Sequence, residues 1–382
     1  MTKKRINLSN VLITLAVAFL NVIIVIFPKE TIEASKAGVG LWLETVLPSL
    51  LPFTIGANIL YATGVTGLAG KLFEPLTQFL WGVPGEGAFV LISGMLSGYP
   101  TGAVTVGDLR KNGDISKTEA QRLISFVNNA GPLFIIGAVG VGMFGNVYIG
   151  YFILTTHYIS AIVVGFIFRF YKRSFASVVK KKKTKTKEAS FKSIGTILSQ
   201  SVVKSMETML LVGGFIILFR VVIEALNILG FFSLFPEFAS NIFSGAIELA
   251  NGCEKLADSG TVKLSAIAVA VVISFGGFSV HTQSLAFISK TDISTVVYLL
   301  SKFLHAIIAA IVGSILYPLF NSAIEHMRTV EASSDYLSAE KSRISMIIDN
   351  FSTGAMLFGI MIVIVIVAAM ISRMTVTRTV RK

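Results

Sequence analysis

The chain has 382 residues, of which 53% are hydrophobic and 14% are charged, and its mean hydropathy is +0.77. Its apolar residues form long blocks, which excludes a water-soluble globular domain and indicates a polytopic membrane protein. The formal net charge is +12, but the basic residues concentrate in short runs. They therefore predict cytoplasmic loops and no binding of nucleic acid. A single cysteine, Cys253, excludes an internal disulfide framework.

Residues 1–37 are predicted to hold an uncleaved signal-anchor span. The basic stretch Lys3-Lys4-Arg5 precedes the apolar residues 11–27, and no small-x-small cleavage site stands before Pro28. The chain should therefore enter the membrane from the cytoplasmic side.

A second span is predicted over residues 41–61, and residues 67–81 are predicted to form an interfacial helix. The next apolar stretch breaks at Ser97-Gly98-Tyr99-Pro100-Thr101. From Gly85 to Gly98 a helix is roughly 20 Å long, against roughly 30 Å of hydrocarbon. The sequence therefore predicts a re-entrant hairpin over residues 85–111. Its tip is a candidate site, because non-helical backbone at such depth needs protein or water around it.

A capping box, Ser116 with Glu119, begins the next helix. This helix meets Asn128-Asn129-Ala130-Gly131-Pro132 at a depth of about 18 Å. Because Pro132 has no amide hydrogen, the carbonyl of Asn128 has no helical donor. This carbonyl and two amide side chains are therefore predicted to be free near mid-membrane. The helix should resume over residues 133–144. A span over residues 148–171 follows, and then a basic cytoplasmic linker, residues 172–192.

The second half is predicted to repeat the first. Met206-Glu207-Thr208-Met209-Leu210 matches Leu43-Glu44-Thr45-Val46-Leu47. Residues 236–256 again resemble an interfacial helix, and residues 263–274 are again too short to cross. Because glycines and polar residues follow them, a second re-entrant hairpin is predicted over residues 263–290. Further spans are predicted from Asp292 to Tyr317 and over residues 356–371, followed by a basic tail, residues 373–382.

Together these elements predict an all-α polytopic membrane protein with about seven transmembrane helices and two re-entrant helical hairpins. Glu44 follows one crossing, whereas Glu207 follows the cytoplasmic linker, so the two repeats enter from opposite faces. The first repeat covers residues 38–171 and the second residues 193–372. Such an inverted-topology repeat places a substrate site near mid-bilayer, between its halves.

Four groups of polar residues lie at matched depths in the predicted spans. They are Ser97, Gly98, Tyr99 and Thr101 at the first tip; Asn128 and Asn129 at the break; Ser279, His281, Thr282 and Gln283 at the second tip; and Lys302 with His305 on one helix face. No acidic residue accompanies them, and helix N-termini at the tips direct positive dipoles inward. The predicted pocket therefore suits a small carboxylate.

Structural roles are the alternative for each of these residues. The glycines would also allow close helix packing, and the hydroxyl side chains would also cap broken helix ends. Lys302 could extend to the interface, and His305 could be an interior histidine with satisfied hydrogen bonds. No HExxH, GxSxG or P-loop motif and no paired carboxylates on one helix are found. We therefore expect no enzyme, cofactor or metal site.

The stretches that follow resemble one known family. They are residues 97–103, 115–120, 126–139 and 276–281. They are similar to the YlbJ (SpoVV) type of sporulation integral membrane protein, in the wider group with nucleoside-recognition Gate domains. The resemblance covers about residues 41–320 and implies that both repeats are Gate-like. It also implies a protein of endospore formers in the outer forespore membrane that passes dipicolinic acid, a small aromatic dianion, toward the spore.

The leading expectation is a multi-pass bacterial membrane protein that transports a small carboxylate, above all dipicolinate. One alternative is a nucleoside permease, which needs a sodium site and carboxylates or amides for the ribose. The sequence offers the amides but no carboxylate at its predicted hairpin tips. The other alternative is a non-transporting membrane protein of spore-envelope assembly. The expected partners are a small anion and the lipid bilayer.

Overall fold

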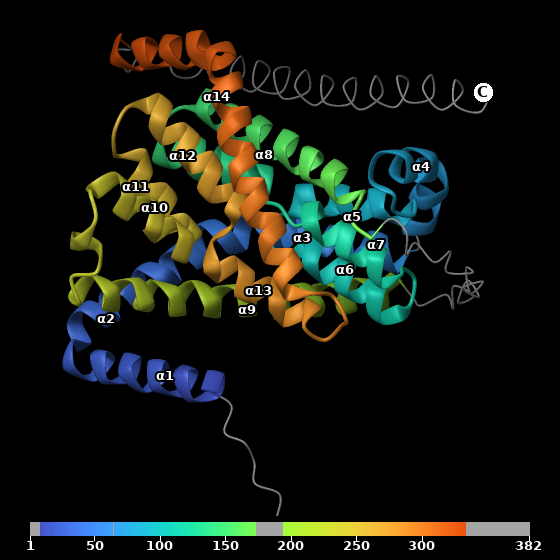
Figure 1. Cartoon of the computed structure of the whole chain (residues 1–382), viewed down its shortest axis with the longest axis horizontal. Coiled ribbons are helices and arrows are strands. Elements are labelled where there is room, and N and C mark those ends of the chain that lie inside the picture. The colour runs from blue at the N-terminus through green and yellow to red at the C-terminus, as the bar shows by residue number, and fades with distance from the viewer. Residues whose placement is uncertain (1–7, 64, 173–193, 334–382) are drawn as a thin grey trace, which may run out of the picture.

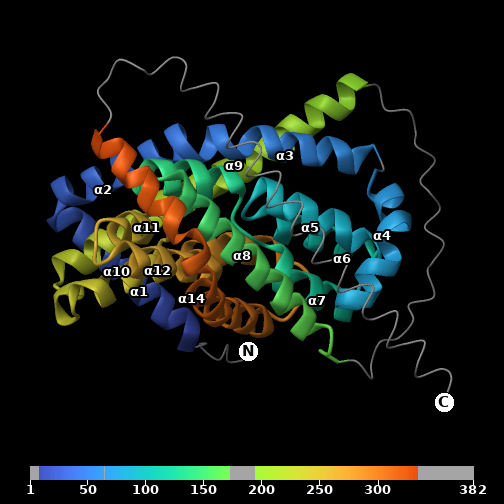
Figure 2. The same cartoon turned by 90° about the horizontal axis from the view of Figure 1, so that it is seen from above.

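The computed structural model describes residues 8–63, 65–172 and 194–333, and these residues are almost entirely helical (Figures 1 and 2). Within these described residues, four helical stretches are long and apolar enough to cross a membrane, and six if two bent pairs count as single spans. The protein is therefore an all-α polytopic membrane protein, as predicted. The predicted span over residues 356–371, the basic tail and nearly all of the linker lie outside the described residues.

The chain begins with two helices that meet at a sharp angle. Helix α1 (Leu8–Ile26) is bent by 107° from α2 (Pro28–Gly40), which starts at Pro28, a residue favoured at the first helical position. A π-helical segment, η1 (Leu41–Val46), and α3 (Leu47–Ala62) continue α2 without a non-helical residue between them. Residues 28–62 thus form one long helical run, which extends the predicted second span toward the N-terminus.

The first predicted hairpin is present. Helix α4 (Val65–Trp81) is bent by 81° from α5 (Glu86–Ser97), and α5 is followed by α6 (Thr101–Asn112). The chain turns at Gly98, whose φ of +76° favours glycine. The two limbs then pack closely, since a Cβ added to Gly94 would lie 3.4 Å from the Cα of Gly102. How deep this hairpin lies in a membrane stays a prediction.

The broken helix of the first half is also present. Ser116 and Glu119 form the predicted capping box of α7 (Lys117–Val127), each side chain accepting from the other residue's backbone N–H. Residues 128–132 interrupt the helix, which resumes as the π-helical segment η2 (Leu133–Met143). Helix α8 (Val147–Phe168) follows, with Asn146 as its N-cap.

In the second half, the position predicted for the hairpin is wrong. Helices α12 (Val262–Phe275) and α13 (Gly277–Ile288) form one span of 27 residues, interrupted at Gly276. Such a span is about 40 Å long and can cross, whereas each half alone cannot. Gly276 has a φ of +96°, and the helix resumes immediately after it. The length of residues 263–274 alone is therefore a misleading signal.

The second hairpin consists of α10 (Glu237–Ile247) and α11 (Leu249–Ala257), which the sequence indicated as interfacial. A single extended residue, Glu248, joins them. The limbs run antiparallel, because Asn251 donates to Ser244 at 2.8 Å and Gly252 touches Gly245. The described part of the chain therefore contains two hairpins, but the second covers residues 237–257 and not 263–290.

The corrected elements reveal the repeat more fully. Each half has a long helix, a hairpin, a broken span and a closing helix, which is α8 in the first half and α14 (Thr295–Ser333) in the second. The long helix of the second half is α9 (Ile194–Ile228), followed by a short 3-10 turn, η4 (Phe232–Leu234). Helix α4 has no counterpart among the described elements of the second half.

Equivalent helices of the two halves pack antiparallel. On α8 and α14, His157 stacks on His305 with 4.8 Å between ring centroids, whereas Asn146 bonds to the carbonyl of Ile324 at 3.0 Å. Helices α3 and α9 lie side by side in Figure 2 and also run in opposite directions. Antiparallel pairing of equivalent elements is what an inverted repeat requires.

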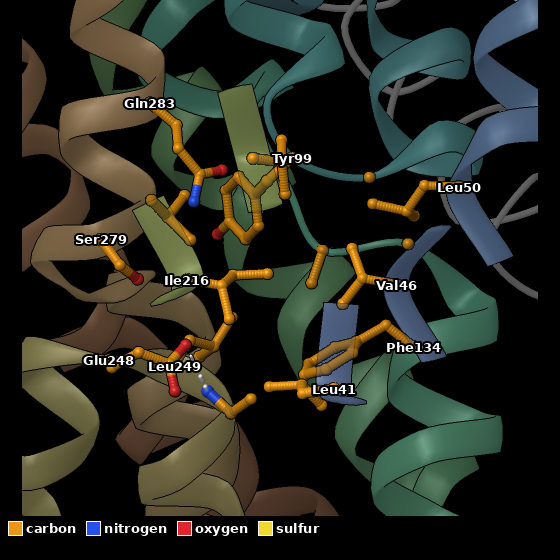
Figure 3. Close-up of a pocket in the computed structure, with 16 residues that line it drawn as sticks. Leu41, Val46, Leu50, Tyr99, Phe134, Ile216, Glu248, Leu249, Ser279 and Gln283 are labelled. Atoms are coloured by element: carbon orange, nitrogen blue, oxygen red, sulfur yellow. Dashed lines mark hydrogen bonds between the residues drawn. The ribbon is translucent and has the colours of Figure 1, made fainter. Parts of the chain in front are cut away.

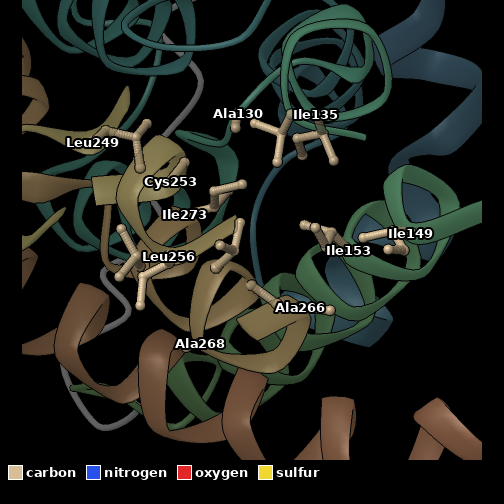
Figure 4. Close-up of a cluster of buried hydrophobic side chains, with 14 of the residues drawn as sticks. Ala130, Ile135, Ile149, Ile153, Leu249, Cys253, Leu256, Ala266, Ala268 and Ile273 are labelled. Carbon is tan, nitrogen blue, oxygen red and sulfur yellow. The ribbon is translucent and has the colours of Figure 1, made fainter. Parts of the chain in front are cut away.

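The two halves share their hydrophobic core. In one cluster, Ile135 of η2 and Ile153 of α8 pack with Cys253 of α11 and Ile273 of α12 (Figure 4). Each of these side chains is less than 1% exposed, so η2, α8 and the second hairpin pack closely against one another. Burial of this apolar area stabilises the contact between the halves by about 25 cal/mol per Å².

A surface ion pair joins the first hairpin to the turn before α14. Arg110 contacts Asp292 through two hydrogen bonds of 2.7 and 2.9 Å, which lower the pKa of the Asp292 carboxyl. The pair is partly exposed, so Asp292→Asn should cost at most about 1 kcal/mol. Because the folded pKa lies below the unfolded value of about 3.9, this stability is present at neutral pH and is lost as the pH falls through the folded pKa. Thermal midpoints of wild type and variant should therefore differ at pH 7 and converge below about pH 4.

Candidate functional site

One cavity lies where both hairpin tips and both helix breaks converge (Figure 3). It encloses about 550 Å³ of empty space, its open mouth included. Its lining residues come from both halves of the chain. They are Leu41, Val46, Leu50, Gly98, Tyr99, Ala130, Gly131, Phe134, Val212, Ile216, Glu248, Leu249, Ala250, Ser279, Val280 and Gln283.

The pocket has a polar side and an apolar side. Ser279 and Gln283 lie one helical turn apart on α13, together with Glu248 on the polar side, whereas Val46 and Leu41 lie on the other (Figure 3). The buried hydroxyl of Ser279 has no hydrogen-bond partner within the described chain. Gln283 likewise makes no hydrogen bond to the described residues, although it is only 3% exposed. Both side chains are therefore available to a ligand.

Tyr99 ties the first hairpin tip to the second broken span. Its hydroxyl donates to the carbonyl of Ile273 at 3.0 Å, which the interruption at Gly276 leaves without a helical partner. One side of its ring lines the pocket, and the ammonium of Lys302 lies 5.7 Å from the ring centroid. Lys302 does not line the pocket itself, but it lies beside Tyr99, which does.

Glu248 forms the second tip, and the prediction that no acidic residue joins the site is wrong. Its carboxylate accepts hydrogen bonds from the backbone N–H groups of Ala250 and Asn251, at 3.1 and 2.8 Å. Arg220 of α9 approaches to 3.9 Å. Arg220 also donates to the side chain of Asn251 at 2.8 Å. It therefore fastens the hairpin tip to α9.

Asn128 sits behind the pocket, where protein groups use its hydrogen-bonding capacity. Its side chain accepts from the backbone N–H of Ala103 at 3.3 Å and donates to Ser284 and Tyr298 at 2.8 and 3.2 Å. Its carbonyl, freed by the break, accepts from the ammonium of Lys302. The residue thus connects the first hairpin with α13 and α14.

His157, which sequence reasoning missed, lies between the two breaks. It accepts from the N–H of Ala130 at 3.2 Å and contacts the hydroxyl of Ser274 at 2.9 Å. His305 donates to the carbonyl of His157 at 3.0 Å. A signal was available in the sequence: a glycine follows each histidine by eight residues, in α8 and again in α14. The two rings therefore occupy equivalent positions of the repeat.

The predicted site residues fall into three groups. Gly98, Tyr99, Ser279 and Gln283 line the pocket. Asn128, Asn129, His281, Lys302 and His305 are buried outside its lining, as is Ser97, and His281 contacts the hydroxyl of Tyr298 at 3.3 Å. Thr101 lines a different cavity, and Thr282 bonds to carbonyls of its own helix. Their roles in binding stay predictions.

In the part of the chain that the structure describes, no three His, Cys, Asp or Glu side chains are arranged to hold a metal ion. The polar groups of the site are hydroxyls, amides, two stacked imidazoles, one ammonium and the carboxylate of Glu248, which Arg220 approaches. Such groups recognise a ligand by hydrogen bonds and charge.

Fold and site define an α-helical membrane protein built from two inverted halves around a central pocket. The family model "Gate: Nucleoside recognition" matches residues 43–172, which cover most of the first half. The chain is also 35% identical, over 346 residues, to the sporulation integral membrane protein YlbJ of Bacillus subtilis (strain 168). That match covers 83% of this chain and 85% of its relative. The chain belongs to the YlbJ family of sporulation integral membrane proteins. No solved structure matches it.

Proposed function

We propose that this protein transports a small organic anion, with dipicolinate as the first candidate, and binds it in the central pocket. The observation that carries the proposal is a pocket between inverted halves with two unpartnered polar side chains, Ser279 and Gln283, aimed into it. The family resemblance found in the sequence suggests dipicolinate and an outer forespore membrane location.

Charge favours an anion in this pocket. Helices α6, η2 and α13 all begin beside it, so their positive dipole ends lie near a bound ligand. Lys302 is fully buried, and within the described residues no carboxylate forms an ion pair with it. A bound carboxylate would supply the missing negative charge, as buried charges need compensation. Glu248 opposes this only weakly, because two backbone N–H groups and Arg220 already compensate it.

Nucleoside transport is the second candidate. Two observations favour it: the match to the nucleoside-recognition model and the presence of Glu248 at a hairpin tip that lines the pocket. A carboxylate can accept hydrogen bonds from ribose hydroxyls. It ranks second because both Glu248 oxygens already accept hydrogen bonds from their own helix.

The combined substitution Ser279→Ala and Gln283→Ala tests the proposal. The purified full chain in lipid nanodiscs should bind dipicolinate, and the double variant should bind it at least about tenfold more weakly, since each hydrogen bond to a charged group contributes about 1.5–3 kcal/mol. The measurement is isothermal titration calorimetry, with Ser289→Ala at the exposed end of α13 as the matched control.

A parallel experiment in spores separates the alternatives. Spores of a strain in which the gene for this protein carries the double substitution should contain less dipicolinate than wild-type spores, while the variant protein remains in the membrane. Normal dipicolinate content would contradict the proposal. Binding of adenosine or uridine without binding of dipicolinate would favour the permease. Absence of binding to either, with normal dipicolinate content, would favour a role in envelope assembly.

A further inference from the structure

We infer that the ammonium of Lys302 takes the place of a bound cation at the first helix break, so that the protein needs no sodium ion to hold this site together. A corollary is that Lys302→Ala opens a site for a small monovalent cation. The consequence for transport rests on the proposed function, whereas the cation site itself does not.

The first helix break, residues 128–132, leaves a backbone carbonyl without its helical partner. Discontinuous membrane helices free such carbonyls near mid-bilayer, and in many transporters these carbonyls coordinate Na⁺. Here the freed carbonyl of Asn128 accepts from the ammonium of Lys302, which reaches it from α14 in the other half. Lys302 is completely buried, so the positive charge of its ammonium lies inside the protein. An ammonium and a sodium ion are both compact monovalent cations that seek oxygen lone pairs.

A second oxygen at the same break, in the side chain of Asn129, has no hydrogen-bond donor beside it among the described residues. The side-chain oxygen of Asn129 is buried and has no hydrogen-bond partner among the described residues, while its nitrogen donates to the carbonyl of Phe126 at 2.7 Å. Unpaired buried oxygens are rare in folded proteins. Removal of the lysine side chain would leave the Asn128 carbonyl unpaired as well, so two adjacent residues of the break would each have a buried oxygen without a donor.

The second break is satisfied in a matching manner. Its freed carbonyl, that of Ile273, accepts from the hydroxyl of Tyr99, which belongs to the first half. Each half therefore sends one donor into the break of the other: Lys302 to Asn128 and Tyr99 to Ile273. Both breaks have internal donors, so neither requires an ion from solution.

The test compares thermal unfolding of the purified full chain in chloride salts of sodium, potassium, lithium and choline at equal ionic strength. The wild-type midpoint should be the same in all four salts. Lys302→Ala should be less stable in choline and should regain a few degrees in a saturable manner with one of the small cations. Lys302→Met fills the same space without a charge and should respond to none of them.

Two results would overturn the inference: a wild type that sodium stabilises over choline, or a Lys302→Ala protein without cation-specific stabilisation. Failure to recover folded Lys302→Ala in any of the four salts would count equally against it. These readouts involve no dipicolinate, so a failure of dipicolinate binding would leave the inference standing. Conversely, dipicolinate uptake into proteoliposomes that requires a sodium gradient would overturn the inference and leave the proposed function intact.

Discussion

Substituting Gly252 by alanine should abolish correct packing of the second hairpin, at a cost of about 3 kcal/mol or more. A Cβ at this position would lie 2.0 Å from the Cα and 2.4 Å from the backbone nitrogen of Gly245. Both neighbours are backbone atoms, so no side chain can rotate away, and the limbs of the hairpin must separate. The measurement is the thermal midpoint, together with the yield of monodisperse protein in detergent.

Gly214 on α9 is the matched control. A Cβ added there meets nothing within 4 Å, so Gly214→Ala should be neutral or stabilising by up to about 1 kcal/mol, owing to the helix propensity of alanine. Equal midpoints for the two variants would contradict the hairpin geometry of α10 and α11.

Glu248→Ala should cost about 3 kcal/mol or more. The substitution leaves two backbone N–H groups without their acceptor, and it removes the partner of Arg220, which is 15% exposed. Chemical or thermal unfolding in detergent measures the loss. Glu254→Ala is the control, because that carboxylate also pairs with Arg220 but is 58% exposed, and it should cost less than about 1 kcal/mol. Equal stability of both variants would show that Glu248 is not the fastening point.

Glu248 also separates the two candidate ligands. Glu248→Gln removes the negative charge and keeps one acceptor oxygen. Dipicolinate binding should be unchanged or tighter in this variant, because a like charge leaves the pocket. Nucleoside binding through this carboxylate would instead weaken. Titration of both ligands into the same preparation decides between them.

Local chemistry explains which elements the sequence predicts correctly. The first hairpin, the capping box at Ser116 and the break at residues 128–132 are all marked by residues whose backbone or side-chain properties act within one turn. The match between residues 43–47 and 206–210 likewise indicates the repeat from the order of residues alone. Such signals are readable because they do not depend on distant parts of the chain.

The misplaced hairpin shows where this reasoning ends. The turn Ile247-Glu248-Leu249 contains no glycine or proline, and its signal is the close approach of Gly245 and Gly252, a contact visible only in three dimensions. Conversely, Gly276 interrupts a helix without turning it. The polarity of Asn128 predicts a binding residue, but Ser284, Tyr298 and Lys302 use its hydrogen-bonding groups. Sequence polarity does not reveal which buried groups already have protein partners.

The reciprocal bonds from Tyr99 to Ile273 and from Lys302 to Asn128 restrict how the molecule can move. These bonds join the first hairpin tip to the second helix break, and α14 to the first helix break. The joined elements form one body, which carries Ser279 and Gln283 of the pocket. The antiparallel pair α3 and α9 forms a second body with its own small core, and Val46 and Ile216 present aliphatic surface to the pocket. Polar contacts also bridge the two bodies, because Arg220 of α9 holds Glu248 and Asn251 and Lys204 of α9 pairs with Asp108 at 2.7 Å. Any motion that opens the pocket along the aliphatic surfaces must therefore bend or break these contacts, while Ser279 and Gln283 move together on the first body.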